Sequence, residues 1–320
     1  MPRPFFALAP LANVTDAAFR RIIATYSKPN GPQVMYTEFV SADGLMLAGE
    51  IGKQKLLCDL LFTDAERPIV AQFFTSKPDM MEHAASLAAE LGFDGVDINM
   101  GCPDRSIEKQ GAGAMLIKNP KLTQELIAAA KRGAPGLPVS IKTRLGYDRD
   151  VLEDWLPVLL GAHPAAIALH ARTRKEMSKV PAHWNRLKRA VEIRDEMQSN
   201  TRIIGNGDVR TLADAQEKAV FSGVDGVMLG RAIFGRPWLF AESADPSIAE
   251  RLRSAAQHAA LFEALLGPAS VSGKSFAIMK KHFKAYVEGF DGAKELRARL
   301  METEHAAQVE DIIEHFLKTS

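Results

Sequence analysis

Cysteine is scarce in this sequence, which has only Cys58 and Cys102 among its 320 residues. A secreted fold held by disulfides uses several cysteine pairs, so the scarcity argues against that class. No apolar stretch approaches the ~20 residues that a membrane-spanning helix requires. The first residues lead directly into a strand pattern, without the apolar core and cleavage site of a signal peptide. We therefore expect a cytoplasmic protein that contacts no membrane.

An excess of charge of either sign is also missing, because 40 basic residues stand against 39 acidic ones. A protein that binds nucleic acid usually presents a basic face, but such a face can be hidden in a balanced total. Either of the two local basic groups could also be an ordinary solvated surface. The groups are Arg172, Arg174, Lys175 and Lys179, and Lys274, Lys280, Lys281 and Lys284.

Up to about residue 235, short β-rich runs alternate with helical patterns. Several runs are almost continuously apolar, as expected for parallel strands that are covered on both faces. The predicted strands are 6–10, 34–39, 69–74, 95–99, 139–144, 166–170, 202–206 and 226–230, with helices between them such as 78–91, 122–131, 151–160 and 212–221. Eight such units predict an α/β fold of the (β/α)8 TIM-barrel type. An open doubly wound sheet is the alternative, but its early glycine fingerprint is missing.

The strand pattern disappears from about residue 245. Amphipathic helices are predicted over 248–266, 274–287, 293–303 and 306–317, with breaks at Gly267-Pro268 and at 289–292. We therefore expect two domains, a catalytic barrel over residues 1–243 and an all-helical C-terminal domain over residues 244–320.

A thiol follows the fourth predicted strand, in the run Asn99-Met100-Gly101-Cys102-Pro103. The carboxyl ends of the strands carry the chemistry of (β/α)8 barrels. Pro103 disfavours helical backbone at Cys102 and so keeps this segment extended. Cys102 is therefore a candidate catalytic residue, whereas Cys58 is expected to be an inert packing residue.

Lys142 and His170 end the fifth and sixth predicted strands. A lysine among apolar residues needs an anionic or polar partner, because an unpaired buried charge is costly. Lys142 could form a structural ion pair, or it could contact the N1–O2 edge of a flavin, where negative charge accumulates on reduction. His170 could contact a ligand or be structural, but it lacks the neighbouring ligands of a metal site. Arg144 and Arg172 follow, where they could meet a phosphate or a carbonyl.

Glycines follow the last two predicted strands, in the runs 205–208 and 230–231. Backbone N–H groups at glycines can approach an anion closely, and this corner of the barrel commonly binds phosphate. Tight turns without a ligand are the alternative. At the third strand end, the amide of Gln72 could face a flavin or uracil edge, or only satisfy loop backbone. Together with Cys102 and Lys142, these features predict a flavin enzyme that reduces a pyrimidine.

At these residues the chain resembles the tRNA-dihydrouridine synthase family. The Asn-x-Gly-Cys-Pro run followed by Gly-x-Gly-Ala is a highly specific signature. The matching segments are 9–16 with Phe19-Arg20, Thr37-Glu38, 97–103, 111–114, 142–144, 170–173, 206–208 and 230–231, and more loosely 279–283 and 289–293 in the helical tail. Leu11 stands where the family usually has methionine, and Asn13 where glycine or another small residue is common. Neither departure alters the assignment, because the first conserves volume and asparagine tolerates unusual backbone angles.

The resemblance implies FMN as the cofactor, NADPH as the electron donor, a uridine of tRNA as the substrate and no obligatory protein partner. It also implies that Cys102 gives a proton to C5 of the uracil, while hydride from the flavin adds at C6. The expected cofactor contacts are Pro10, Leu11, Ala12, Gln72, Lys142, His170, Asn206, Gly207, Asp208, Gly230 and Arg231. The expected substrate contacts are Asn99, Arg144, Arg172, Lys280 and Lys281.

A proton donor must hold its proton at neutral pH, and an ordinary thiol with a pKa of about 8.5 does so. We therefore predict that Cys102 is not strongly acidified, although Lys142 and Arg144 are expected nearby. Because a stacked base cannot reach the pocket, the uridine must be turned out of the RNA. Candidates for a basic platform that holds the tRNA are Lys274, Lys280, Lys281, Lys284, Arg174, Lys175 and Lys179.

Three other functions are compatible with parts of this pattern. The first is a barrel flavoenzyme that acts on a free pyrimidine, such as a dihydroorotate or dihydropyrimidine dehydrogenase, although a free base needs no basic helical tail. The second is a tRNA-binding module without catalysis, against which the intact Cys102 and Lys142 argue. The third is a phosphate-binding barrel without flavin, in which Lys142 would form a Schiff base.

Overall fold

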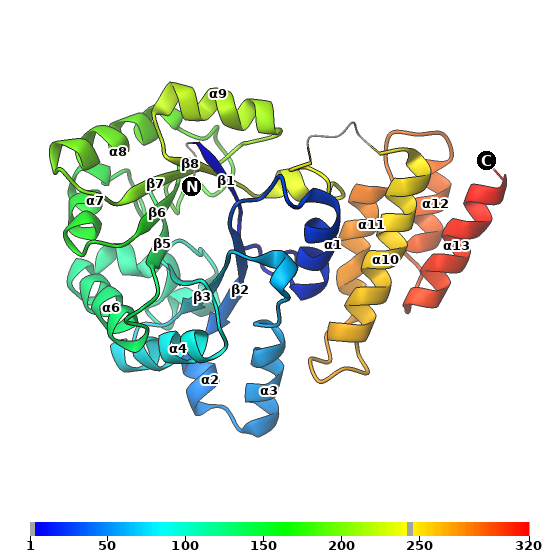
Figure 1. Ribbon diagram of the computed structural model, residues 1–320, viewed down its shortest axis with the longest axis horizontal. Coiled ribbons are helices and arrows are strands. Elements are labelled where there is room, and N and C mark those ends of the chain that lie inside the picture. Colours follow the sequence, from blue (N-terminus) through cyan, green and yellow to red (C-terminus); the bar gives the residue numbers. More distant parts are fainter. Residues whose placement is uncertain (1–3, 242–245, 320) are drawn as a thin grey trace.

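The computed structural model describes residues 4–241 and 246–319 and contains one eight-stranded parallel sheet (Figure 1). The strand order is β1-β8-β7-β6-β5-β4-β3-β2. The two ends of the sheet meet, because Val34 forms a parallel bridge with Ala7 and accepts a 2.9 Å hydrogen bond from the N–H of Leu8. The predicted (β/α)8 barrel is therefore confirmed. The strands are β1 Phe5–Leu8, β2 Met35–Ser41, β3 Ile69–Phe74, β4 Gly95–Asn99, β5 Val139–Arg144, β6 Ala166–His170, β7 Arg202–Asn206 and β8 Gly226–Leu229.

Helices cover the outside of the barrel. They are α1 Ala17–Ser27, α2 Ala42–Leu47, α3 Glu50–Cys58, α4 Pro78–Glu90, α5 Arg105–Glu108, α6 Pro120–Gly133, α7 Leu152–Gly161, α8 Trp184–Glu196 and α9 Leu212–Ser222. Local sequence explains several of their ends. The Asp16 side chain accepts a hydrogen bond from the N–H of Phe19 and starts α1, and Pro78 and Pro120 begin α4 and α6. After β8 the described residues form a 3-10 turn, Arg231–Ile233, and the next α-helix is α10 of the helical region.

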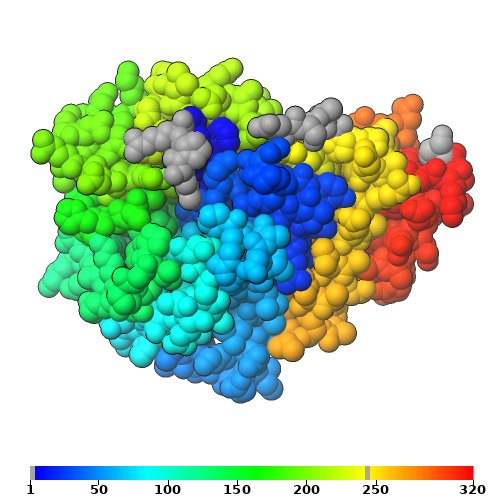
Figure 2. Space-filling view, in the orientation of Figure 1, coloured from blue at the N-terminus to red at the C-terminus, as the bar shows by residue number. Residues whose placement is uncertain are grey.

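The C-terminal region is helical, as predicted, and packs beside the barrel through α1 and α10 (Figures 1 and 2). Its helices are α10 Ile248–Leu266, α11 Met279–Tyr286, α12 Ala293–Leu300 and α13 Ala306–Thr319. The helix predicted over 274–287 is too long, because residues before the Phe276–Ile278 3-10 turn run as a loop along the barrel. The predicted domain boundary at residues 243–244 lies outside the described residues. Within the described part of the chain, no helix has the length and apolar character to span a membrane.

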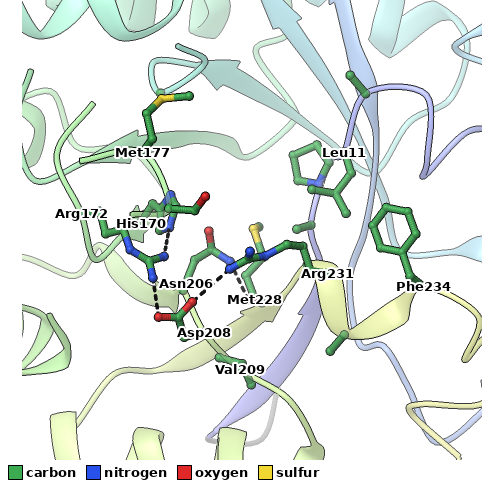
Figure 3. A pocket seen from close by; sticks show the side chains of 18 of the residues that line it. Leu11, His170, Arg172, Met177, Asn206, Asp208, Val209, Met228, Arg231 and Phe234 are labelled. Carbon is green, nitrogen blue, oxygen red and sulfur yellow. Dashed lines mark hydrogen bonds and ion pairs between the residues drawn. The ribbon is translucent and has the colours of Figure 1, made fainter. Parts of the chain in front are cut away.

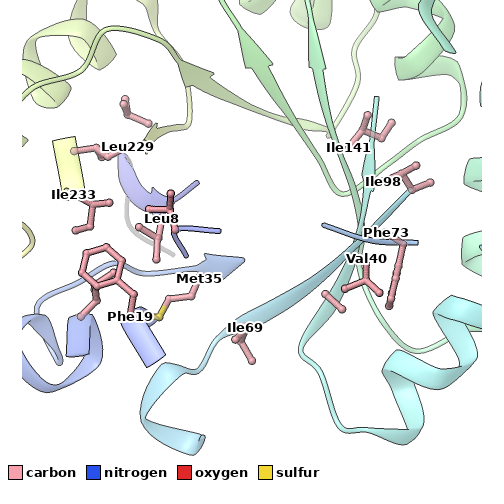
Figure 4. Close-up of a cluster of buried hydrophobic side chains, with 14 of the residues drawn as sticks. Leu8, Phe19, Met35, Val40, Ile69, Phe73, Ile98, Ile141, Leu229 and Ile233 are labelled. Carbon is pink, nitrogen blue, oxygen red and sulfur yellow. The ribbon is translucent and has the colours of Figure 1, made fainter. Parts of the chain in front are cut away.

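Alternation along the strands decides which residues reach the interior of the barrel. In β5, Val139 and Ile141 pack outward against the helices, so Ser140, Lys142 and Arg144 point inward. Figure 4 shows part of the apolar layer between the strands and helices, including Ile98 and Ile141. A second apolar cluster fills the barrel below the strand ends, with Tyr36, Val70, Ala168, Ile204 and Met228 among its members. The polar side chains of the cavity lie above this cluster, at the carboxyl ends of the strands.

Candidate active site

A cavity of about 1250 Å³ opens at the carboxyl ends of the strands (Figure 3). Ordinary small-molecule sites have volumes of roughly 300–1000 Å³, so this cavity has room for a cofactor and a second ligand. Lys281 and Lys284 of α11 form part of its wall, whereas Lys280 does not line it. The other predicted residues that line it are Pro10, Leu11, Ala12, Gln72, Asn99, Cys102, Lys142, Arg144, His170, Arg172, Lys179, Asn206, Gly207, Asp208, Gly230 and Arg231.

The ammonium group of Lys142 faces this cavity without a partner. Lys142 makes no side-chain hydrogen bond or ion pair with residues 4–241 or 246–319. Burial, followed by the charge of Arg144, lowers its pKa to about 8, while the charge of Asp97 acts in the opposite direction. A cation held in this way is suited to an anionic or electron-rich ligand edge, because such an edge would replace the missing counter-charge.

A chain of hydrogen-bonded side chains orients the loop that carries Cys102. Asp97 accepts a hydrogen bond from Gln72 Nε2 at 2.6 Å, and Gln72 Oε1 accepts one from Asn99 Nδ2 at 3.0 Å. Asn99 Oδ1 accepts hydrogen bonds from the backbone N–H groups of Gly101 at 3.2 Å and Cys102 at 2.9 Å. Gln72 and Asn99 therefore have fixed orientations at the cavity wall.

The thiol of Cys102 is not acidified. Burial raises its pKa, and the charge of Asp104 also acts in this direction. The charges of Arg144 and Lys142 and the backbone N–H of Asp104 oppose the increase but do not outweigh it. This direction agrees with the expectation that Cys102 is not strongly acidified, and its role as proton donor stays a prediction.

Gly113, in the Gly-x-Gly-Ala run, allows close packing behind the Cys102 loop. Its φ is +62°, and a Cβ there would lie 2.8 Å from the carbonyl oxygen of Cys102. The same carbonyl accepts a 3.0 Å hydrogen bond from the N–H of Ala114. On the other side, Arg144 Nε donates to the carbonyl of Gly101 at 2.7 Å. The loop is thus held from both sides.

His170 is an uncharged residue at the centre of the site. Burial, together with the charges of Arg144, Lys142 and Arg172, lowers its pKa to about 2. Arg172 Nη1 lies 3.2 Å from His170 Nε2, its Nε donates to the carbonyl of Val180 at 2.6 Å, and its Nη2 pairs with Asp208 (Figure 3). Because the Arg172 side chain is only 3% exposed, its donors serve the protein interior. Its expected substrate contact stays a prediction, and the geometry indicates an indirect role through His170 and Asp208.

The ends of β7 and β8 form a corner rich in free backbone donors. The N–H groups of Gly207, Asp208, Gly230 and Arg231 have no hydrogen-bond acceptor among residues 4–241 and 246–319. Arg231 pairs with Asp208 at 3.0 Å, yet its side chain is 67% exposed. Asn206 Nδ2 donates to the carbonyl of Met228 at 2.8 Å and ties the two strands together. Backbone N–H groups without acceptors beside an arginine are suited to bind a phosphate group.

Lys274 is predicted to belong to the basic platform for RNA, and this prediction is wrong because the residue is held in an ion cluster at the barrel. Lys274 forms ion pairs with Glu38 at 2.9 Å and Asp59 at 2.7 Å and is only 17% exposed. Two carboxylates of the barrel already neutralise it, which removes it from the exposed basic surface. Arg174 is similarly paired with Glu108, whereas Lys175 and Lys179 are exposed.

Several cavity residues had not been predicted from the sequence. They belong mainly to the loop after β6 and to segments that follow the glycine ends of β7 and β8. These residues are Phe39, Met177, Ser178, Val180, Pro181, Val209, Arg210, Ala232, Phe234 and Arg236, with Ala285 and Glu288 at and just after the end of α11. Most of them follow the predicted site residues at 170–173, 206–208 and 230–231 closely in the sequence, which could have indicated them. Their side-chain types form no recognisable motif.

The sequence matches the family described as "Dihydrouridine synthase (Dus)" over residues 7–320. A "Probable tRNA-dihydrouridine synthase" of Staphylococcus epidermidis is 39% identical over 318 residues, which cover 99% of this chain and 94% of the relative. A "Probable tRNA-dihydrouridine synthase 2" of Bacillus subtilis is also 39% identical, with 99% of this chain and 95% of the relative covered.

Solved structures with a similar fold include a 2-naphthoyl-CoA reductase and the histamine dehydrogenase from Rhizobium sp. 4-9. The former has a TM-score of 0.54 and 9% sequence identity, with 73% of this chain and 49% of that chain covered. The latter has a TM-score of 0.53 and 13% identity, with 73% of this chain and 44% of that chain covered. At these identities the likeness concerns the barrel fold alone.

Proposed function

The chain belongs to the dihydrouridine synthase family and is a flavin-dependent tRNA-dihydrouridine synthase. We propose that its flavin is FMN, that NADPH is the electron donor, and that Cys102 protonates the uridine. One observation carries the proposal: the side chains of Cys102 and Lys142 line the same cavity, and Lys142 has no hydrogen-bond or ion-pair partner among the described residues. Burial raises the pKa of the thiol, which suits it to hold a proton. A free base would not require the basic α11 wall, so tRNA is favoured over a free pyrimidine.

The cavity offers complementary groups for each part of FMN. When bound, the flavin supplies the hydride that adds to C6 of the uracil ring. The Lys142 ammonium group would hold the electron-rich N1–O2 edge, with neutral His170 beside it. The phosphate would accept hydrogen bonds from the free N–H groups at 207–208 and 230–231 and from the Arg231 side chain. Asp208 would contribute only its N–H, because its carboxylate already pairs with Arg172 and Arg231.

The further predicted contacts close the cofactor site. Pro10, Leu11 and Ala12 would line one side of the ring system, and Gln72 would present its oriented amide. Asn206 would act mainly by holding the β7 and β8 ends together. These assignments follow from wall position and hydrogen-bond capacity.

Cys102 would act as the general acid. Addition of hydride at C6 places negative charge on C5 and O4, because the C5–C6 bond is conjugated to the C4 carbonyl. The Sγ–H group would then give its proton to C5. Afterwards the charges of Lys142 and Arg144 would stabilise the sulfur anion until solvent returns the proton. Asn99 and Arg144 would support this step by holding the loop, besides the base contacts expected of them.

The helical region would hold the tRNA body while one uridine is turned into the cavity. The lysines that would contact phosphates are Lys179, Lys281 and Lys284, which line the cavity, and Lys175 and Lys280, which do not. We accordingly assign residues 1–243 to catalysis and residues 244–320 to tRNA binding. Since tRNA is the substrate, we place the enzyme in the cytoplasm.

Incubation of the flavin-loaded protein with NADPH and either unmodified tRNA or free uracil tests this function. We expect dihydrouridine in the tRNA, and oxidation of NADPH that depends on it, with little reaction of uracil. Replacing NADPH by NADH tests the donor separately. Reduction of uracil without reaction of tRNA would instead favour a free-pyrimidine reductase, and a colourless protein that binds no flavin would exclude both enzymes.

A further inference from the structure

A buried ion cluster joins the helical region to the barrel. Lys274 lies in the loop between α10 and α11, and its Nζ is 2.9 Å from Glu38 Oε2 and 2.7 Å from Asp59 Oδ1. Burial alone would lower the pKa of Lys274, but the two carboxylates outweigh burial and raise the pKa, so the group stays charged. The Glu38 side chain is only 7% exposed, and Lys274 is its direct ion-pair partner, with the charge of Lys281 acting from farther away.

The second carboxylate oxygen of Glu38 holds the turn that follows β1. Glu38 Oε1 accepts a hydrogen bond from the backbone N–H of Asn13. Asn13 has a φ of +53°, which is uncommon for a residue other than glycine and persists only when its surroundings impose it. Leu11 N–H donates to Thr15 Oγ1 at 2.8 Å within the same turn. Leu11 and Ala12 line the cavity, so the turn is a wall of the cofactor site.

We propose that Glu38 and Lys274 are positioning residues through which the helical region sets the shape of this wall. Lys274 fixes one oxygen of the carboxylate, and the other oxygen is thereby aimed at the Asn13 N–H. Without the ammonium group, a buried carboxylate would turn towards water and release Asn13. The identity of the ligand as FMN rests on the proposed function, whereas the effect on the turn does not.

This arrangement also couples RNA binding to cofactor binding. Lys274 precedes α11 in the chain, and α11 carries Lys281 and Lys284 at the cavity wall. An RNA phosphate bound at Lys281 or Lys284 would therefore act on the same segment that holds Glu38. By thermodynamic linkage, bound FMN should strengthen tRNA binding by the same factor that tRNA strengthens FMN binding.

The experiment compares Lys274→Met, Glu38→Gln and Lys274→Arg with a matched control, Gln257→Ala. Gln257 accepts a 3.0 Å hydrogen bond from Tyr26 between α10 and α1, and so joins the same two regions without touching the turn. Two quantities are measured without RNA: hydrogen exchange at the Asn13 amide in the flavin-free protein, and the FMN dissociation constant by fluorescence titration.

For Lys274→Met we expect both quantities to increase about tenfold, the scale of one lost charge-assisted hydrogen bond. Lys274→Arg should stay near wild type because it keeps the charge, and Gln257→Ala should change neither quantity. Glu38→Gln keeps an acceptor but loses the charge, so it should show a smaller change in the same direction and decides the matter if Lys274→Met does not fold.

Unchanged Asn13 exchange and FMN affinity in the folded variants would overturn the proposal, even if tRNA affinity or thermal stability falls. A wild-type protein that binds no FMN would instead contradict the proposed function, and the exchange at the Asn13 amide would still test whether Lys274 and Glu38 position the turn. Equal increases in the Asn13 exchange rate and the FMN dissociation constant in Gln257→Ala would also overturn the proposal. They would show that the loss of any contact between the helical region and the barrel has this effect.

Discussion

The side-chain oxygen of Asn99 accepts a 2.9 Å hydrogen bond from the backbone N–H of Cys102. The last residue of β4 therefore determines where the thiol lies, and Gln72 in turn orients Asn99. Asn99 holds the backbone of residue 102, and the sulfur adds only an interaction with the backbone N–H of Asp104. Replacement of the Cys102 side chain leaves the hydrogen bonds that Asn99, Arg144 and Ala114 make with the backbone of this loop in place, so its chemical role can be tested.

Cys102→Ala should retain bound flavin and reduction of the flavin by NADPH, but lose dihydrouridine formation. Removal of a general acid typically costs about 10²–10⁴-fold in rate. Stopped-flow absorbance follows flavin reduction, and nucleoside analysis of the tRNA follows product. Cys58→Ala is the matched control, because Cys58 lies in α3 outside the cavity and should leave both steps intact. Loss of flavin reduction in Cys102→Ala would contradict the role of proton donor.

Flavin affinity should fall as pH rises through about 8, the pKa of Lys142 in the flavin-free protein. Below this pH the ammonium group is charged and attracts the electron-rich edge of the ligand; above it the amine is neutral. The limiting dependence is about tenfold per pH unit. Fluorescence titration between pH 6.5 and 9.5 tests this expectation. Lys142→Met should bind weakly at every pH, and a pH dependence that survives in this variant would assign the titration to another group.

Gly207→Ala should weaken flavin binding and lower the melting temperature. Gly207 has a φ of +129°, and a Cβ there would lie 2.9 Å from Cβ of Ala182 and 3.1 Å from Cδ2 of His170. Backbone strain of this kind costs about 1–3 kcal/mol. Gly136→Ala is the control, because a Cβ at Gly136 meets nothing within 4 Å. If both variants melt and bind alike, the β7 corner is more adaptable than the geometry indicates.

Changing Lys280 and Lys281 together to glutamate should weaken tRNA binding and reduce its salt dependence. Each lost phosphate contact removes about 0.7–0.9 from the slope of log K against log salt. Filter binding at several salt concentrations measures this slope, and the flavin absorbance spectrum should remain unchanged. The control pair is Lys121 and Lys188, exposed residues of α6 and α8 that do not line the cavity. An unchanged slope would move the RNA surface away from α11.

Acid should destabilise the protein through two buried histidines. The rings of His258 and His282 lie 4.5 Å apart between α10 and α11, and burial lowers the pKa of His282 to about 3 and that of His258 well below its ordinary value. Both groups gain protons on unfolding below about pH 6.5, so their stabilising contribution is present above that pH and is lost as pH falls towards 3.

Each histidine contributes up to about 1.4 kcal/mol per pH unit to this loss. His282→Phe should therefore show a flatter decline in the free energy of unfolding between pH 6.5 and 4.5, measured by urea titration. Asp16 has the opposite effect on the free energy of unfolding as the pH falls, because burial, followed by the charge of Glu38, raises its pKa to about 7. The comparison between wild type and variant removes this contribution, and parallel curves would show that His282 is not responsible.

The sequence by itself determined the barrel and the inward set of strand residues. Alternation along a strand is a local property, so apolar Ile141 beside polar Lys142 already specifies which of them faces the interior. The predicted ranges of all eight strands differ from the observed bounds by at most two residues. The positions of Cys102, His170 and the two glycine ends at one rim follow from this pattern alone.

Only the tertiary structure decided which charged groups are free to act. Lys274 and Lys281 look alike in the sequence, yet Glu38, which lies 236 positions before Lys274, neutralises it, while Lys281 reaches the cavity wall. Arg172 is likewise used internally by Asp208, 36 positions away. Ion pairs depend on where distant segments of the chain meet, and no local pattern encodes that meeting. The alternation of polar and apolar residues thus places the polar side chains at the barrel rim. Long-range packing decides which of them form internal ion pairs and which can bind a ligand.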